Sequence, residues 1–513
     1  MSAFLEALTF VVTPYNFMLL VIGVFGGIVV GAIPGLTGSV GIILLLPFLF
    51  FVDTANALIM LCGVFCGAIY GGSIASILVG TPGTPSAAAT MLDGYPMAQK
   101  GEAGKAIGVA TIASTSGGII SMLFLILIAP QLARFGLRFG PPEFFALICF
   151  ALTIIASVSA DSLIKGLLAG FFGLLVATVG LDPLLGYSRL TFGIPRLMSG
   201  FPMLAVLIGV FAISQLFMQL QDVGKDYKVP DQKMKNILPS WSELKGLIKT
   251  IVPASVLGTF LGLVPGTGGA IASFWAYGEV KRFSKNPETF GTGNIHGVAA
   301  PEAANNGTTG GALVPLLTLG IPGDVMTAVM LGALMVVGIR PGPMLFRDSP
   351  EMINSLFVAL IFAQFLILGL GLLSVRVLPK VLKTPPSILF PIVFALCFIG
   401  AFSLNNSPYG MLVALIFGVV GYFMRKNGLP PAPFIIGVIL GPLAEGYLGR
   451  ALVTSKGDWS ILFRSGIAIF FYVLAVLSLL YSLLSPYLRK RRAAASANRE
   501  SAAGTDNAKE GKE

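Results

Sequence analysis

The chain carries the same Pro-Gly pattern twice, each time inside strongly apolar segments. The pattern Gly-x3-Gly-x2-Pro-Gly-x2-Gly occupies residues 27–38 and recurs 231 residues later at 258–269. A second pair of breaks, Gly-Thr-Pro-Gly at 80–83 and Gly-Ile-Pro-Gly at 320–323, has an offset of 240 residues. Later matches keep the same order at an offset of 244, namely Pro141-Pro142 with Pro385-Pro386, Phe150-Ala151-Leu152 with Phe394-Ala395-Leu396, and Gly166 with Gly410. This ordered series predicts two copies of one structural unit.

The composition places both copies in a membrane. Of the 513 residues, 55% are hydrophobic and only 11% are charged, whereas soluble proteins carry about 25% charged residues. The mean hydropathy of +0.88 agrees. These values exclude a soluble enzyme, a disordered chain and a small disulfide-stapled protein. We therefore expect an all-α polytopic membrane protein with two repeated halves and about 12 transmembrane crossings.

The Pro-Gly breaks indicate what such a membrane protein does. Proline removes a backbone donor and blocks helix continuation, while glycine permits the tight turn that follows. Backbone groups freed in this way are tolerated at membrane depth only where they line a polar cavity or are buried in protein. The N-termini of broken helices suit carboxylates, and the freed carbonyl groups suit Na⁺. Paired broken helices in two halves are typical of secondary transporters.

Charge bias divides the chain and orients it. We expect a first membrane repeat at 1–220, a basic cytoplasmic linker at 221–249, a second repeat at 250–488, and a cytoplasmic basic end with a disordered tail at 489–513. No Lys or Arg precedes Lys100, which favours an external N-terminus and therefore inverted repeats. The apolar segments 39–52, 308–320 and 433–445 are shorter than a full crossing, so we expect them to be re-entrant.

The second half contains the richest polar stretch, from His296 to Gly311. It includes Asn305, Asn306, Thr308 and Thr309, whose amides and hydroxyls can donate to a carboxylate. Glu302 in the same stretch is costly to place in a membrane, which suggests ion coupling. The alternative is that this stretch is a solvated loop that follows the basic residues 281–285.

Polar residues also accompany the other breaks. A Ser or Thr in a membrane helix often bonds only to its own backbone, but their position beside breaks favours a site. Asp324 follows a break directly, so it either caps the next helix or binds an ion. With Glu302 and Asp324 as candidates for ion coupling, the predicted substrate-binding residues are Gly35, Thr37, Gly38, Ser39, Thr81, Gly83, Thr84, Gly266, Thr267, Gly268, Asn305, Asn306, Thr308, Thr309 and Gly323.

Other functions find little support in the sequence. The chain has one His, no P-loop, no nucleophile elbow and no metal-binding spacing of carboxylates, so we expect no enzyme activity and no cofactor beyond Na⁺ or H⁺ as coupling ion. Its four cysteines lie in apolar stretches and are expected in the core. No basic run is interleaved with aromatic residues, so the expected surroundings are the lipid bilayer rather than nucleic acid.

Several motifs closely resemble the large membrane subunit of the tripartite tricarboxylate transporters, the TctA family. They are Val298–Asn306, Leu319–Gly323, Gly332–Met335 with Arg340–Pro343, and Leu92–Ala98 with Lys100–Gly104. The resemblance covers about residues 14–485. Gly80, Thr84 and Gly307 depart from the family pattern, which commonly has Asn, an acidic residue and Ala at these positions.

The resemblance implies a bacterial inner-membrane symporter of carboxylates, driven by a Na⁺ or H⁺ gradient. It also implies two partners, a small four-helix membrane subunit (TctB-like) and a periplasmic substrate-binding protein (TctC-like). The sequence shows no Arg within the breaks, and Arg340 lies near the end of one only, so a small carboxylate suits the site as well as a tricarboxylate. The alternative function is a stand-alone carboxylate exchanger or a channel that needs no binding protein.

Overall fold

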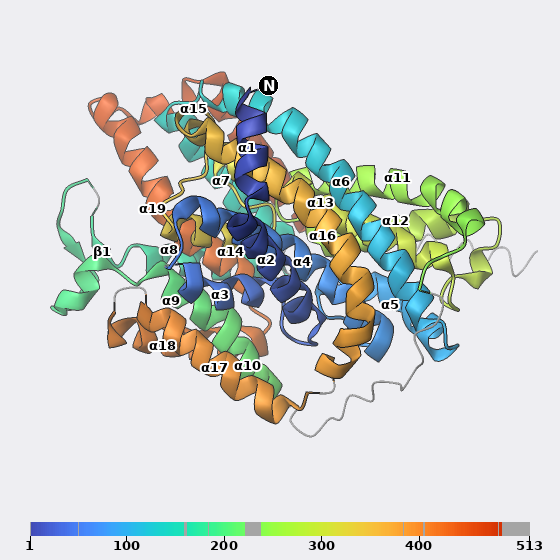
Figure 1. The fold of residues 1–513 in the computed structure, drawn as a ribbon. Helices are drawn as coiled ribbons and strands as arrows, with labels where there is room; N and C mark the ends of the chain where they lie inside the picture. Colours follow the sequence, from blue (N-terminus) through green and yellow to red (C-terminus); the bar gives the residue numbers. More distant parts are fainter. Residues whose placement is uncertain are drawn as a thin grey trace, which may run out of the picture.

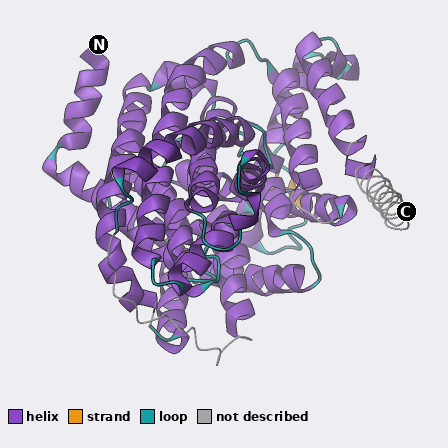
Figure 2. Ribbon diagram, turned by 90° about the vertical axis from the view of Figure 1, so that its right-hand side faces the viewer, coloured by secondary structure: helices purple, strands orange, loops and turns teal. Residues whose placement is uncertain are grey.

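The protein is helical almost throughout. The computed structural model describes residues 2–49, 51–158, 162–182, 184–220, 237–382, 384–403, 406–480 and 482–484. Within these ranges the helices pack into one body, and the only sheet is a small hairpin (Figure 2). The expected all-α fold is therefore confirmed. Most of the predicted linker (221–236) and the predicted tail (489–513) lie outside the described residues.

The first half begins with a peripheral helix and ends with a π-helical segment, η3, followed by a short α-helix, α10. In order, its elements are α1 (Ser2–Val12), α2 (Pro14–Ala32), α3 (Gly38–Leu49), α4 (Thr54–Val79), η1 (Pro85–Ala87), α5 (Ala88–Gln99), α6 (Ala103–Gly136), α7 (Pro141–Val158), α8 (Leu163–Ala177), β1 (Gly180–Leu181), β2 (Ser188–Arg189), η2 (Pro195–Ser199), α9 (Met203–Leu207), η3 (Ile208–Ile213) and α10 (Ser214–Leu220).

The second half repeats the alternation of long helices with short ones that start at breaks. In order, its elements are α11 (Trp241–Leu263), α12 (Gly268–Phe283), η4 (Pro287–Thr289), α13 (Ile295–Leu319), α14 (Val325–Val336), α15 (Pro343–Asp348), α16 (Pro350–Leu382), α17 (Pro386–Ser403), α18 (Pro408–Lys426), α19 (Pro431–Thr454) and η5 (Trp459–Phe463), after which residues 466–480 are again helical.

Many of these helices can cross a membrane. Among the described residues, nine are long and apolar enough, namely Pro14–Ala32, Thr54–Val79, Ala103–Gly136, Met203–Leu220, Trp241–Leu263, Pro350–Leu382, Pro408–Lys426, Pro431–Thr454 and Gly466–Leu484. Several shorter apolar helices accompany them. The chain is therefore a multi-pass membrane protein, while the number of about 12 crossings stays a prediction.

Two of the three segments expected to be re-entrant belong to longer helices. Residues 308–320 form the end of α13, which has 25 residues, and 433–445 lie inside α19, which has 24. Glycine, threonine and proline lower the apolar character of these helices locally, but nearly all of α13 is buried against neighbouring helices, so it continues without a break. The first segment is a separate short helix, α3, of 12 residues.

Glycines allow the central helices of each half to touch along their backbones. A Cβ on Gly27 of α2 would lie 2.6 Å from the carbonyl oxygen of Val64 on α4. In the second half, a Cβ on Gly258 of α11 would collide with the carbonyl oxygen of Ala304 on α13. Small residues permit such close helix packing in membranes, where lipid gives helices no hydrophobic reason to associate. Figure 1 shows α2 and α4 near the centre of the molecule and α11 on its right-hand side, next to α13.

The β1–β2 hairpin projects from the body on the left of Figure 1. It is braced by ion pairs, because Arg189 contacts Asp182 at 3.3 Å and also pairs with Glu445 of α19. The backbone N–H groups of Leu185 and Leu184 donate to Asp182 at 2.7 and 2.9 Å. These bonds hold the pKa of Asp182 below its ordinary value. The ionised carboxylate helps to position Arg189, whose ion pair with Glu445 joins the hairpin to α19.

Candidate functional site

The Pro-Gly breaks have the same backbone conformation in both halves. Gly35 and Gly266 both have positive φ, +84° and +88°. Gly80 and Gly320 both end their helices in the left-handed region, with φ of 67° and 71°. A residue with a side chain is disfavoured there. The matched conformations support the internal repeat, and each break ends one long helix and lets a new helix begin beside it.

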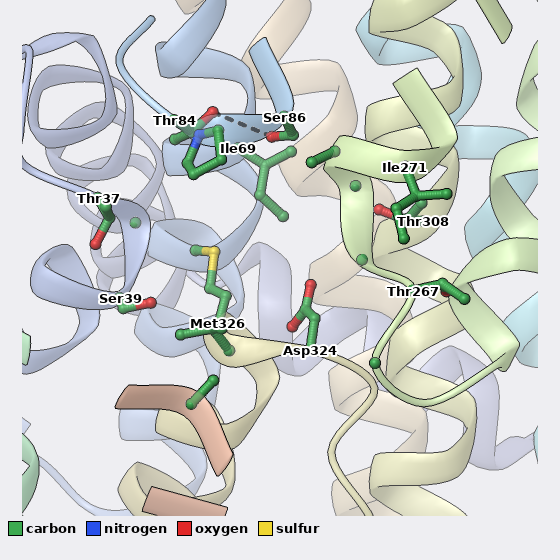
Figure 3. Close-up of a pocket in the computed structure, with 18 of the residues that line it drawn as sticks. Thr37, Ser39, Ile69, Thr84, Ser86, Thr267, Ile271, Thr308, Asp324 and Met326 are labelled. Atoms are coloured by element: carbon green, nitrogen blue, oxygen red, sulfur yellow. Dashed lines mark hydrogen bonds between the residues drawn. The ribbon is translucent and has the colours of Figure 1, made fainter. Parts of the chain in front are cut away.

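A cavity of about 460 Å³ lies where these new helices begin. Figure 3 shows residues from both halves facing one another across it. Its lining comes from the starts of α3, η1, α12, α14 and α19, from one face of α13, and from α4, η3 and the end of α18. The residues are Thr37, Gly38, Ser39, Ile69, Thr84, Pro85, Ser86, Phe211, Gly266, Thr267, Gly268, Gly269, Ala270, Ile271, Asn305, Thr308, Asp324, Val325, Met326, Arg425, Pro430, Pro431, Ala432 and Ile436.

The structure brings most of the predicted site residues together in this cavity. Those that line it are Thr37, Gly38, Ser39, Thr84, Gly266, Thr267, Gly268, Asn305, Thr308 and the ion-coupling candidate Asp324. The others are not part of its lining, namely Gly35, Thr81, Gly83, Glu302, Asn306, Thr309 and Gly323. Gly323 still shapes the site, because its carbonyl oxygen accepts the backbone N–H of Gly266 at 2.6 Å and joins the two breaks of the second half.

Three helices of substantial length point their N-termini at the cavity. They are α3, α12 and α14, with 12, 16 and 12 residues. The first N–H groups of a helix have no partner within it, and the aligned peptide dipoles give that end roughly half a positive charge. Thr267 precedes α12 but makes no side-chain bond to its first turn; its hydroxyl donates to the carbonyl oxygen of Val264 at 2.9 Å instead. The start of α12 is thus available to an anion.

Asp324 caps the third of these helices. It accepts the backbone N–H of Thr327 at 2.8 Å, and the Thr327 hydroxyl donates to the Asp324 carboxylate at 2.7 Å. Asp324 is therefore a helix cap, as one alternative predicted. Because it also lines the cavity, the other alternative, that it binds an ion, stays a prediction. In Figure 3 its side chain points into the space between Met326 and Thr267.

Arg425 brings a positive charge to the same cavity. It lies in the last turn of α18, and its Nε donates to the hydroxyl of Ser214 on α10 at 3.1 Å. None of the ion pairs within the described ranges includes Arg425. The Pro-Gly breaks contain no Arg, as the sequence shows, but the folded protein brings Arg425 to the cavity from outside the breaks.

The polar stretch of the second half is the buried middle of α13, and the solvated-loop alternative is wrong. Asn305 and Thr308 face the cavity, and the side-chain nitrogen of Asn305 is buried and has no hydrogen-bond partner in the part of the chain that the structure describes. Asn306 and Thr309 face away; Asn306 Nδ2 donates to the carbonyl oxygen of Glu302 at 3.2 Å, and the Thr309 hydroxyl donates to Asn306 O at 2.5 Å. The helix therefore presents one of the two adjacent asparagines to the cavity.

Several lining residues were not predicted from the sequence. Ser86 lies beside a predicted residue and bonds to it, with 3.1 Å between its hydroxyl oxygen and that of Thr84. Arg425 is charged, but it lies at the end of an apolar span, where Lys and Arg usually reach the membrane interface, so its charge is only a weak signal for a site. The apolar lining residues Ile69, Phe211 and Met326 carry no such signal.

Comparison with known proteins identifies close relatives of the chain. Residues 17–436 match the model of the tripartite tricarboxylate transporter TctA family. An uncharacterized 52.8 kDa protein of the TAR-I ttuC' 3' region of Agrobacterium vitis is 36% identical over 480 residues, which cover 94% of this chain and 95% of the relative. An uncharacterized protein of the TAR-II ttuC' 3' region of the same organism is 37% identical over 235 residues, covering 46% of this chain and 97% of the relative. No solved structure matches.

Proposed function

Because the chain belongs to the TctA family of tripartite tricarboxylate transporters, we propose that it is the large permease subunit of a secondary transporter. This transporter imports a carboxylate, up to a tricarboxylate, across the bacterial inner membrane. The cavity between the two halves holds the substrate and is exposed to the two sides of the membrane alternately. Transport is driven by a gradient of Na⁺ or H⁺, and the central linker and C-terminus lie in the cytoplasm.

The convergence of three helix N-termini on one cavity is the observation that carries this proposal. A carboxylate in the cavity meets the starts of α3 and α12, whose first backbone N–H groups donate to it. It also meets the start of α14, where Asp324 already accepts the backbone N–H of Thr327. Asn305 adds a side-chain donor that has no hydrogen-bond partner among the described residues. An unpartnered buried donor costs free energy, so a ligand that accepts from Asn305 restores the lost bond.

The charges of the cavity favour a substrate with more than one carboxylate, accompanied by a cation. Arg425 and Asp324 cancel each other formally, while the three helix ends contribute roughly half a positive charge each. These partial charges offset a monocarboxylate fully but a tricarboxylate only in part. A co-transported Na⁺ or H⁺ offsets the remainder, which links uptake to the ion gradient.

Two partners complete the proposed transporter. A periplasmic binding protein of the TctC type delivers the substrate to the cavity, and a small membrane subunit of the TctB type accompanies the permease. The alternative is a stand-alone exchanger or channel, which transports without either partner. Dependence on the binding protein separates these two functions directly.

The test is uptake of labelled citrate into proteoliposomes that contain the full chain and its small subunit, with and without the binding protein. We expect uptake to require both the binding protein and an imposed ion gradient. Asn305→Ala should raise the KM for citrate about ten- to hundredfold, the loss expected for a hydrogen bond to a charged group. Asn286→Ala, at an exposed position, is the matched control. Uptake that needs neither the binding protein nor a gradient would contradict the proposal and favour a channel.

A further inference from the structure

Glu302 is a buried carboxyl group that the substrate cavity does not use. It lies in α13, one turn before Asn305, and none of its surface is exposed. The hydroxyl of Thr90 on α5 donates to Glu302 Oε1 at 2.5 Å. The hydroxyl of Ser114 on α6 donates to Oε2 at 2.8 Å. Each carboxyl oxygen thus has one hydroxyl partner, from two different helices.

No cation within the described ranges pairs with this carboxyl group. The ion pairs found in the described part of the chain do not include Glu302. On the neighbouring helices, Tyr70 of α4 bonds to Thr111, and Asp93 of α5 accepts from Tyr277 of α12. The other titratable groups of the helices packed against α13, none of which bonds to Glu302, are Cys62, Cys66, Tyr95, Lys105, Arg134, Glu243, Lys245, Lys249, Glu279, Lys281, Arg282, His296, Asp324, Arg347 and Asp348.

An ionised carboxylate without a cationic partner is expensive to bury in a membrane protein. Two neutral hydroxyl donors offset only part of that cost. A protonated carboxyl has no net charge to bury, and its own O–H donates to one of the two hydroxyl groups, which then accepts instead of donating. We propose that Glu302 is a proton-binding site, and that this proton is the ion coupled to transport. The inference rests on the proposed function for its coupling role, but proton binding itself does not depend on it.

The position of Glu302 connects its proton to the cavity. Along α13, Glu302 lies three residues before the cavity residue Asn305; along the first half, its partner Thr90 lies four residues after the cavity residue Ser86. Spacings of three and four residues are one helical turn. An ionised Glu302 therefore repels a carboxylate in the cavity, while a neutral one does not. Proton and substrate binding each favour the other, because such coupling is reciprocal.

The same contact also ties the two halves together. Thr90 belongs to the first half and Glu302 to the second, so their hydrogen bond spans the interface that must change when the cavity changes sides. Separation of α5 from α13 removes the hydroxyl from Oε1 and opens a route for the proton to leave. Proton release is thereby linked to the side on which the substrate leaves.

Infrared spectroscopy of the purified full chain in lipid tests proton binding without any transport. At neutral pH we expect a carbonyl band of a protonated carboxyl group that shifts on deuteration and disappears in Glu302→Gln. Glu288→Gln, which removes an exposed carboxyl from η4, should leave the band unchanged. If Glu302→Gln leaves the spectrum unchanged, Glu302 is ionised and the proposal is wrong.

Transport in proteoliposomes with both partner proteins then tests coupling. Glu302→Gln should exchange labelled citrate for unlabelled citrate within about twofold of the unsubstituted chain, but lose the accumulation driven by an imposed pH gradient. Accumulation equal to that of the unsubstituted chain, or accumulation driven by Na⁺ alone, would overturn the coupling role. A band assigned to Glu302 in a chain that fails to transport citrate under any gradient would instead contradict the proposed function and leave the proton site standing.

Discussion

Gly27 shows at the scale of one residue how closely the central helices approach. Its neighbour Gly26 is the matched control, because a Cβ there meets no atom within 4 Å, whereas a Cβ on Gly27 would lie 2.6 Å from Val64 O. We expect Gly27→Ala to lower the free energy of unfolding by about 1–3 kcal/mol through overpacking. Gly26→Ala should leave it unchanged or raise it slightly, because Ala favours helix.

The native cysteines provide the measurement for this pair of variants. Cys62, Cys66 and Cys397 are buried and Cys149 is half-buried, so a thiol-reactive dye reports the unfolding of the detergent-solubilised chain on heating. Equal unfolding temperatures of the Gly26 and Gly27 variants would contradict the close packing of α2 on α4.

A second prediction at the residue scale concerns the role of Arg425 in substrate selection. If its guanidinium binds one carboxylate of the substrate, Arg425→Gln should raise the KM for a tricarboxylate about ten- to hundredfold. The KM for a monocarboxylate, which the helix ends alone can hold, should change much less. The adjacent Lys426 is exposed, so Lys426→Gln is the control in the same uptake assay. An equal loss for both substrates would mean that Arg425 supports the fold rather than selecting the substrate.

Single residues also show which parts of the site could be predicted from the sequence and which could not. Thr37, Ser39 and Thr267 could be assigned to the site because each follows a Pro-Gly break, and a break fixes where a helix begins. The choice between Asn305 and Asn306 could not be made, because it depends on which face of α13 meets the cavity. That face is set by packing against α6 and α11, which a polar stretch alone does not encode.

At the scale of elements, one carboxylate fastens a loop of the second half to a helix of the first. Asp93 of α5 accepts the backbone N–H groups of Gly291, Gly293 and Asn294 at 2.9, 2.8 and 2.7 Å. Its other oxygen accepts from the Tyr277 hydroxyl at 3.0 Å. Asp93 is fully buried. If its carboxylate is removed, water therefore cannot readily take its place as the acceptor for these donors.

Removal of Asp93 should therefore release the segment between α12 and α13. We expect Asp93→Ala to lower the free energy of unfolding by about 2–4 kcal/mol, because four donors lose a charged acceptor. Hydrogen exchange at residues 289–294 should accelerate most. Glu102→Ala, at an exposed position before α6, is the control. Unchanged exchange in this segment would show that other contacts hold it.

The elements themselves were only partly predictable. The short helix α3 could be predicted, because its apolar segment between a Pro-Gly break and a turn is short. The breaks also predicted where α12 and α14 begin. The continuous course of α13 could not be predicted, because its Gly, Asn and Thr residues resemble a loop. They are stable in a helix here since almost every one of them is packed against another helix.

At the scale of the whole molecule, the cavity belongs to neither half alone. Its wall joins α3 and η1 of the first half to α12, α13 and α14 of the second. A substrate bound there must touch both halves, and its binding energy can therefore bias their relative arrangement. This is the geometry that alternating access requires, and local breaks in one half would not provide it.

Substrate protection of introduced cysteines tests this shared cavity. Ser39→Cys and Thr267→Cys place one thiol in each half, at the starts of α3 and α12. At a citrate concentration ten times its Kd, we expect labelling of both by a small maleimide to slow about tenfold, in proportion to occupancy. Ser188→Cys on the exposed hairpin should label at the same rate with and without citrate. Protection of one thiol but not the other would place the substrate within a single half, so the two halves would not share one binding site.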